Sequence, residues 1–418
     1  MKLYSLFITT LLVLGAPAVY AIDLAEMQAM ALGNRQVIRQ YMTILEQSEQ
    51  DIVRARSGYY PSVDIAYTAN SLDEAGLFED KENSIAVGSV SYNLFAGFRD
   101  KYTLLSAEKQ QEYEKHRLQS VKQDIQLNVA LAYLGVTERQ ANRKVAEAAF
   151  QTLEKVYQDG ESRYQVGLIG KNELLKFRVD YDNADITLKA ADADLKKSVN
   201  ILSRQVGSDI ALAELDFADF KKLPPLMDKD EHTRKMLAQR SEIRALEAVI
   251  EVSAAKAEAE LSDYYPRVDV VGSYRRYDDN YISGAGSMED DELRAQLVMS
   301  MNLFQGFYTE ATVARAKLET RSVQYELDEL KNELSNQVTN LHIDFVVSLE
   351  NVEVAKRSIE QAEENLRITQ LKYNEGLERE SDLLDAITSL SRAQYNEVAV
   401  LRTAFLNNFQ LTRMIDGF

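Results

Sequence analysis

Hydrophobic residues recur every three or four positions over most of this chain, a spacing that predicts long amphipathic helices. We expect helices over residues 22–57, 99–157, 172–204, 233–262, 308–372 and 381–415. The pattern is most regular between Leu327 and Leu366, where apolar residues follow one another in steps of three or four. Such a stripe over roughly 40 residues indicates coiled-coil-like packing. A helix of about 60 residues would span roughly 90 Å, at ~1.5 Å per residue.

A second pattern, which alternates from one residue to the next, predicts two strand hairpins. It is clearest in residues 293–302, where the apolar side chains are Leu293, Ala295, Leu297, Met299 and Met301. Residues 63–68, 84–94 and 268–275 alternate in the same way. Strands of about ten residues with one apolar face are typical of membrane β-barrels. An amphipathic hairpin on a soluble domain would alternate equally, so the strands alone leave both possibilities open.

The order of these patterns occurs twice, which predicts a tandem duplication. Tyr-Tyr-Pro starts a strand at Pro61 and again at Pro266, an offset of 205 residues. Asn-Leu-Phe-x-Gly-Phe ends a strand at residues 93–98 and 302–307, an offset of 209. The four extra residues therefore belong to the second hairpin loop. We expect repeats over residues 22–204 and 233–418, joined by a linker over residues 205–232 that contains Pro224-Pro225.

Each repeat has one interruption in its longest helical pattern. Gly376 interrupts the second repeat, and Ser381 or Asp382 can cap the helix that follows. Asp382 and Asp385 are three positions apart, so they share one face of that helix. Residues 163–176 have the same layout in the first repeat. We interpret the two turns as the tips of helical hairpins that together close the end of a tube.

Composition supports long helices and an exported protein. The chain has five prolines, and none lies within residues 67–223 or 267–418. Residues 1–21 have the features of a secretory signal peptide: Lys2, then a largely apolar run, then Val19-Tyr20-Ala21, which offers small residues at the positions before cleavage. An N-terminal membrane anchor is the alternative, although the apolar run is short for a span. After this segment no run of 18 apolar residues occurs.

Several classes of chemistry are excluded by residue content. The chain has no cysteine, so disulfides, thiol catalysis and thiolate metal sites are absent. Its three histidines, His116, His232 and His342, have no metal-ligand spacing. The glycine-rich turns lack the Lys-Ser or Lys-Thr of a phosphate-binding loop. We therefore expect no enzyme activity, no cofactor and no metal. The net charge of −18 argues against a nucleic-acid partner.

Two protein classes remain open on the residues alone. In the first, the strands enter a membrane; four strands cannot close around a channel, so copies of the chain must combine. In the second, the chain is a secreted structural coiled-coil protein that binds partners and never enters a membrane. A periplasmic adaptor is a weaker alternative, because it should contain one helical hairpin between β-rich halves, whereas this sequence predicts two.

The sequence resembles the TolC-like outer-membrane efflux protein family over essentially the whole region after the predicted leader. The resemblance rests on the duplication, the Tyr-Tyr-Pro and Asn-Leu-Phe-x-Gly-Phe motifs, the two Tyr-x-x-Gly-Leu tips, and the segment 381–386. It implies a mainly α fold with a small β part. Three protomers would contribute four strands each to a twelve-stranded transmembrane β-barrel in the outer-membrane lipid, and their helices would form a periplasmic α-barrel. The implied function is an exit duct for efflux or type I secretion.

The resemblance also implies roles for particular residues. The duct would dock with a periplasmic adaptor (membrane fusion) protein and an inner-membrane pump or ABC transporter. Docking falls on the tips, at Val166, Gly167, Leu168, Gly376 and Leu377. The periplasmic gate falls on Asp382, Asp385, Glu173 and Tyr373, with a bond between Tyr373 and Glu173 as one candidate latch. Helix capping is the alternative role for the acidic residues. Relatives often have a basic residue at the position of Glu378, and here a basic residue, Arg379, follows one position later, so the resemblance does not define the details of the latch.

Overall fold

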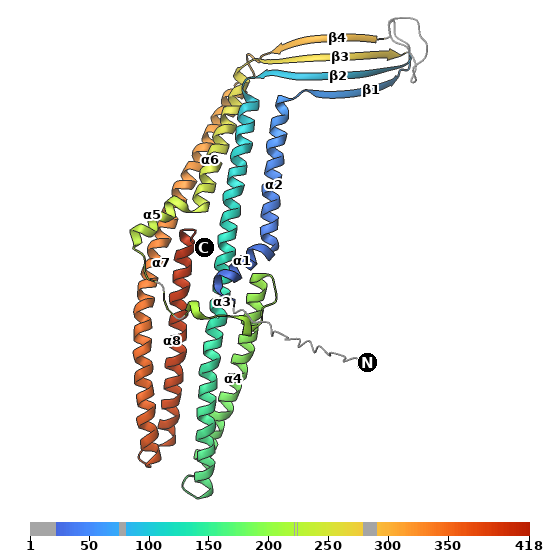
Figure 1. Ribbon diagram of the computed structural model, residues 1–418. Coiled ribbons are helices and arrows are strands. Elements are labelled where there is room, and N and C mark those ends of the chain that lie inside the picture. The colour runs from blue at the N-terminus through green and yellow to red at the C-terminus, as the bar shows by residue number, and fades with distance from the viewer. Residues whose placement is uncertain (1–21, 75–80, 221, 224, 279–290) are drawn as a thin grey trace, which may run out of the picture. The chain divides into compact units, whose positions relative to one another are not determined.

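The computed structural model describes residues 22–74, 81–220, 222–223, 225–278 and 291–418 (Figure 1). The predicted signal peptide over residues 1–21 lies outside the described residues, as does most of the second hairpin loop. Among the helices described, none has a stretch long and apolar enough to cross a membrane.

The elements occur in the same order twice. The first series is α1 (Leu24–Asn34), α2 (Gln36–Arg56), β1 (Ser62–Ser71), β2 (Glu82–Ala96), α3 (Arg99–Gln165) and α4 (Lys171–Val206). The second is α5 (Lys229–Gln239), α6 (Ser241–Glu260), β3 (Arg267–Asp278), β4 (Asp291–Ser300), α7 (Tyr308–Asn374) and α8 (Glu380–Met414). Short 3-10 turns precede β1 (Ser57–Tyr59) and β3 (Leu261–Tyr264), and two more, Leu212–Glu214 and Ala218–Phe220, lie before α5. The predicted fold class, mainly α with a small β part, is confirmed.

The described chain forms two compact units, and each takes segments from both series. One contains residues 125–226 and 344–409 together with α1; the other contains 36–124, 227–343 and 410–418. α3 and α7, of 67 residues each, contribute to both units. The sequence repeats and the compact units are therefore different divisions of the chain.

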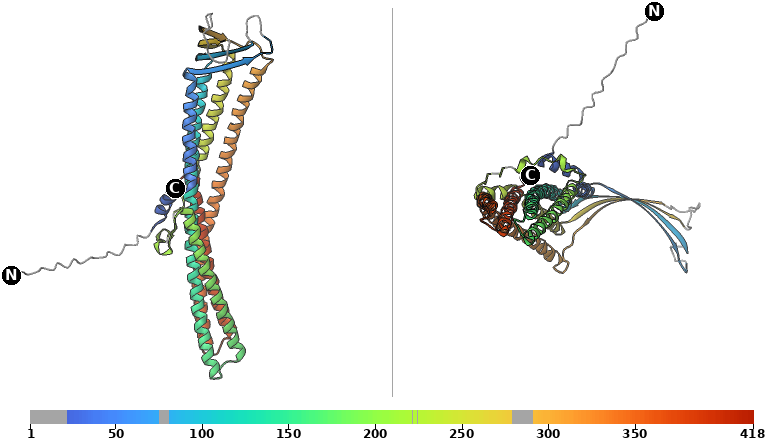
Figure 2. Two further views of the ribbon diagram at one scale, coloured as in Figure 1. Left: turned by 90° about the vertical axis from the view of Figure 1, so that its right-hand side faces the viewer. Right: turned by 90° about the horizontal axis from the view of Figure 1, so that it is seen from below.

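The four strands form one antiparallel sheet in the order β1-β2-β3-β4, so β1 and β4 are its edges. Figure 2 shows that the sheet is strongly twisted. Over its middle part the register aligns residues of like polarity across the four strands. One apolar row is Val63, Val90, Gly272 and Ala295, and the adjacent polar row is Asp64, Ser89, Ser273 and Arg294. The apolar face is uncovered in this chain, since Ile65 is 87% exposed and Leu293 83%.

Two helices that the sequence predicted as continuous are broken. The predicted helix 22–57 bends at Arg35 and the predicted helix 233–262 bends at Arg240, where ψ is 123° and 121°. These arginines are 205 residues apart and act alike. Arg35 donates to the carbonyl of Arg204 (2.8 Å), and Arg240 donates to the carbonyl of Arg413 (2.6 Å). Each guanidinium thus caps the C-terminal end of another helix, where backbone carbonyls lack partners.

Other element boundaries also differ from the sequence prediction. α3 continues to Gln165, beyond the predicted end at residue 157, and β2 continues to Ala96. In contrast, β4 ends at Ser300, before the predicted end at residue 302. α5 begins at Lys229, inside the segment predicted as linker.

The segment after α4 is held by an aromatic cluster within its own unit. Tyr133 of α3 is fully buried, and its hydroxyl donates to the carbonyl of Asp216 and lies 3.2 Å from the carbonyl oxygen of Ile22. Phe220 packs edge-on against Tyr133 (5.3 Å between ring centroids) and against Phe405 of α8 (5.3 Å). A segment of irregular chain and short 3-10 turns is thereby fixed to the long helices α3 and α8.

A buried charged cluster lies in the unit that contains the sheet. Arg413, whose side chain is 5% exposed, pairs with Asp124 (2.8 Å), Glu242 (2.5 Å) and Asp416 (2.6 Å). Arg240 also pairs with Glu242 (2.8 Å). Burial alone would raise the pKa of the Glu242 carboxyl, but the two arginines outweigh it and the pKa is lowered. The cluster joins α3, the start of α6 and the end of α8.

Candidate functional site

The two hairpin tips are built by the same backbone motif. The amide of Gly167 donates to the carbonyl of Tyr164 (3.0 Å), and that of Leu168 donates to the carbonyl of Arg163 (2.9 Å). Gly376 and Leu377 make the equivalent bonds to Tyr373 and Lys372 at 3.0 and 2.9 Å. This is the Schellman arrangement that ends a helix, with the glycine in the left-handed region (φ 76° and 74°). The prediction that these glycines end α3 and α7 is confirmed.

The apolar side chains at the tips do not pack onto their own helices. In a Schellman motif the residue after the glycine frequently contacts the preceding helical turn. Here Leu168 is 73% exposed and Leu377 is 75% exposed, and Val166 is 71% exposed. The fold thus leaves apolar side chains uncovered at matching positions of the two tips, where they are free to contact another molecule.

The acidic residues after each tip cap the next helix. The Glu173 carboxylate accepts from the amide of Gly170 (2.9 Å), and the Asp382 carboxylate accepts from the amide of Arg379 (3.1 Å). The two pairs are equivalent at the 209-residue offset. The capping role that the sequence allowed is therefore present for Asp382. Its role in a gate stays a prediction.

Tyr373 joins the ends of the two hairpins. It is 8% exposed and packs edge-on against Phe177 of α4, with 6.3 Å between ring centroids. The Arg163 guanidinium lies over its ring at 5.0 Å and also donates to the Asn374 side chain (3.3 Å). Burial raises the pKa of the Tyr373 hydroxyl, and the charge of Arg163 opposes that rise. Tyr373 and Glu173 thus have different partners in this structure.

Asp385 lies in a groove between α4 and α8. The groove has a volume of about 440 Å³, and its lining includes Leu175, Val179, Asp180 and Leu384. The pKa of the Asp180 carboxyl is raised, first by burial and then by the charge of Asp385. Two carboxylates of the same protomer therefore repel one another across this groove.

An ion pair lies beside the same groove. Lys176 of α4 and Glu380 of α8 approach to 2.5 Å, and the pairing lowers the pKa of the Glu380 carboxyl. Together with the Arg163 contacts it joins the first hairpin to the second. Sequence reasoning did not single out Arg163, Asp180 or Glu380. Lys176 and Asp385 occupy equivalent positions and have opposite charges, which indicates from the sequence that the two tips differ in charge.

Within the described residues, no group of three acidic, histidine or cysteine side chains is placed to hold a metal ion. The site thus consists of two exposed apolar tips, a buried tyrosine that joins them, and a set of carboxylates around the starts of α4 and α8.

Comparison with known proteins assigns the family. The family model described as outer membrane efflux protein matches residues 28–208 and 233–416. The alkaline protease secretion protein AprF of Pseudomonas aeruginosa is 22% identical over 312 residues, which are 72% of this chain and 63% of AprF. The outer membrane protein TolC of Escherichia coli is 23% identical over 304 residues, which are 69% of this chain and 60% of TolC.

The fold is that of a solved outer-membrane channel. The structure of OprN superimposes with a TM-score of 0.80 and 17% identity, and the match covers 94% of this chain and 90% of OprN. The chain belongs to the outer membrane efflux protein family, and its location is the outer membrane. The matched region spans less than two thirds of the length of AprF and of TolC.

Proposed function

We propose that this chain is one protomer of a trimeric outer-membrane exit duct for efflux or type I secretion. The observation that carries the proposal is the sheet, whose register brings apolar residues of all four strands together on one face. An uncovered apolar face of this size suits lipid, and the opposite polar face suits a water-filled lumen.

The open edges of the sheet account for the trimer. β1 and β4 are edge strands, and unpaired backbone groups are not tolerated in hydrocarbon. Four strands are too few to enclose a channel, whereas twelve can do so. Three copies therefore complete the barrel, and their helices extend into the periplasm.

The tips are the proposed docking site. Leu168 and Leu377, with Val166 beside them, would contact the helices of a periplasmic adaptor, and the assembly would reach an inner-membrane pump or ABC transporter. Asp382 and Asp385, supported by Glu173 and Tyr373, would form the periplasmic gate. The names of AprF and of the family, which refer to secretion and efflux, support a transport role.

The membrane assignment is tested by placing a charge on either face of β4. Leu297→Arg and Met299→Arg put a cation on the apolar face, and this costs ~2–4 kcal/mol at the bilayer midplane. Both variants should reduce the amount of trimer recovered from the outer membrane. Gln296→Arg is the matched control, because the neighbouring side chain belongs to the polar face.

Trimer levels are measured after outer-membrane fractionation and gentle detergent extraction. Equal levels in all three variants would reject the face assignment. A wild-type protein that stays in solution without detergent would instead favour the secreted coiled-coil alternative.

A further inference from the structure

The junction between strand and helix is complete in the first series and incomplete in the second. Gly97 and Gly306 are equivalent and have nearly the same φ, 61° and 59°. A Cβ at Gly97 would lie 2.5 Å from the Ser262 carbonyl oxygen and 2.9 Å from the Tyr265 Cβ. A Cβ at Gly306 would meet nothing within 4 Å. The first glycine is thus in close contact with the turn that precedes β3, whereas no described residue of the protomer makes the equivalent contact with the second.

The surrounding side chains repeat this difference. Phe98 packs edge-on against Tyr265, with 5.7 Å between ring centroids. Its equivalent, Phe307, is 69% exposed. Tyr60, the equivalent of Tyr265, is also 69% exposed. The contact between Phe98 and Tyr265 therefore forms within the chain, whereas Phe307 and Tyr60, the equivalent residues, are both left exposed.

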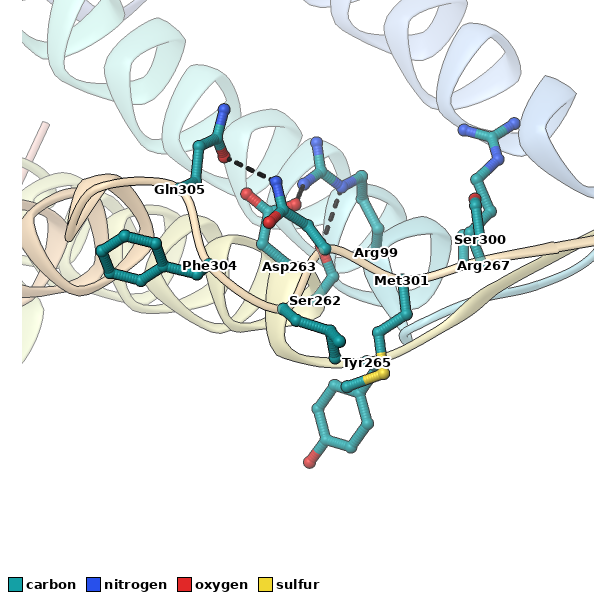
Figure 3. A pocket seen from close by; sticks show the side chains of 12 residues that line it. Arg99, Ser262, Asp263, Tyr265, Arg267, Ser300, Met301, Phe304 and Gln305 are labelled. Atoms are coloured by element: carbon teal, nitrogen blue, oxygen red, sulfur yellow. Dashed lines mark hydrogen bonds and ion pairs between the residues drawn. The ribbon is translucent and has the colours of Figure 1, made fainter.

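The segment after β4 has the same local aromatic packing as the segment after β2, although no described strand pairs with it. Phe304 and Phe307 stack edge-on at 5.5 Å and 87°, as Phe95 and Phe98 do at 5.2 Å and 88°. However, β2 pairs with β3 as far as Ala96, whereas β4 ends at Ser300. The segment after Ser300 borders an open pocket of about 870 Å³, with Met301 and Phe304 at its wall (Figure 3).

We propose that the start of β1 from a second copy completes this junction, and that the duplication fixes the register. The proposal rests on the trimeric duct proposed above. Applying the offsets of 209 and 205 residues to the pairing of β2 with β3 gives the pairing of β4 with the partner strand. Ser300 lies opposite Ala66 of the partner subunit, Met301 opposite Ile65 of the partner subunit, and Asn302 opposite Asp64 of the partner subunit.

Beyond Asn302 the proposed pairing contains a β-bulge, as the pairing of β2 with β3 does. The internal pairing skips Leu94, since Asn93 pairs with Asp269 and Phe95 with Val268. The equivalent bulged residue is Leu303, which is 87% exposed. Phe304 then lies opposite Val63 of the partner subunit.

This register is chemically consistent along its length. Met301 and Ile65 both belong to apolar faces, whereas a slip of one residue would oppose apolar to polar side chains. The Asn93 amide donates to the Asp269 carboxylate at 2.8 Å, so Asn302 and Asp64 of the partner subunit are the equivalent pair. In the single chain Asn302 donates instead to its neighbour Gln305 (3.2 Å).

The chain has no cysteine, so introduced thiols report the register directly. The double variants Ala66→Cys/Ser300→Cys and Ile65→Cys/Met301→Cys test two adjacent pairs. One of them is of the close, non-hydrogen-bonded kind because such pairs alternate in an antiparallel ladder. Val63→Cys/Met301→Cys is the matched control on the same face, with its thiols shifted by two residues.

After oxidation of outer membranes, non-reducing gels should show covalent dimers and trimers. The better of the two direct pairs should form them at least about five-fold faster than the control, because diagonal positions ~7–8 Å apart exceed disulfide reach. The internal equivalents, Ser91→Cys/Val271→Cys and Tyr92→Cys/Val270→Cys, calibrate the yield within one chain and should give no oligomer.

Faster cross-linking of the shifted pair would overturn the register. Trimers that remain intact in detergent without cross-linking at either direct pair would overturn the junction and leave the duct standing. A protein that stays monomeric in the membrane would overturn both proposals.

Discussion

Among single residues, Arg413 combines a permanent charge with almost complete burial. Its guanidinium is almost fully buried among three carboxylates, and Arg240 shares one of them, Glu242. A buried charge is stable only while its partners satisfy it, and removal of one partner leaves an uncompensated charge. The residue therefore acts as a connection between helices that are distant in sequence.

Replacing Arg413 with Met should lower the free energy of unfolding by ~3–5 kcal/mol at neutral pH. The lowered pKa of Glu242 means that its stabilising contribution is present above its unfolded pKa and is lost as pH falls through its folded pKa. The cost of the substitution should therefore shrink in acid, where Glu242 is protonated in any case.

Denaturant titrations of the detergent-solubilised protein at neutral and acidic pH measure both effects. Arg402→Met is the control on the same helix. Its ion pair with Glu138 is partly exposed (43% and 19%), so the expected cost is below ~1 kcal/mol. Equal costs for the two variants would contradict the importance of burial.

Gly306 gives a second prediction at this scale. Gly306→Ala places a methyl group where no described atom of the protomer lies within 4 Å, but where the segment that precedes β1 of the proposed partner would pack. Trimers of this variant should dissociate at a lower temperature than those of Gly376→Ala, which has a similar positive φ and open surroundings. Heating in detergent followed by native gels compares them. Identical dissociation temperatures would show that only backbone strain matters.

Among the elements, the helical hairpins end in tips whose leucine side chains are exposed and do not pack onto the hairpin itself. Each tip satisfies its own backbone and leaves a leucine in solvent. Because the turns are held by backbone hydrogen bonds, the apolar side chains can be changed without loss of the hairpin.

Leu168→Asp combined with Leu377→Asp should abolish export while trimers persist, because charged side chains would have to be desolvated at an apolar contact. Export assays and cross-linking to the adaptor provide the measurements. The matched variant Leu168→Met with Leu377→Met retains apolar surface and should export normally. Normal export by the aspartate variant would remove the tips from the docking surface.

The elements also show which parts of the fold are readable from sequence. The long helices and tips were predicted because periodicity and a left-handed glycine are local signals. The breaks at Arg35 and Arg240 were missed, since each depends on a carbonyl about 170 residues away. The Arg163–Tyr373 contact was missed for the same reason, because it joins helix ends that are far apart in the chain. The polarity pattern of a helix predicts which of its faces is buried, but it does not specify which other element packs against that face.

At the scale of the whole molecule, three copies would bring three Asp382 and three Asp385 side chains around one axis. Like charges in a narrow aqueous space are poorly screened, so the rings should attract cations and exclude anions. Asp180 lies close to Asp385 and adds a further carboxylate to each protomer. Because its pKa is raised, Asp180 becomes neutral at a higher pH than an ordinary aspartate.

The variant Asp382→Asn/Asp385→Asn should weaken both cation selectivity and block by divalent or trivalent cations on the periplasmic side. Asparagine retains an oxygen that can cap α8, so the substitution changes charge with little effect on the helix start. Single-channel recordings in planar bilayers compare it with wild type. Unchanged block and selectivity would leave these residues as helix caps alone.

The ion pair between Lys176 and Glu380 bears on the ancestry of the chain. At the 209-residue offset, the counterpart of Lys176 is Asp385 and that of Glu380 is Lys171. A ring of six identical first repeats would oppose lysine to lysine at this contact, and a ring of six second repeats would oppose glutamate to aspartate. Once the repeat existed in two copies, the charges at these positions could diverge in opposite directions. Duplication thus made an attractive contact available that identical repeats in the same arrangement would lack.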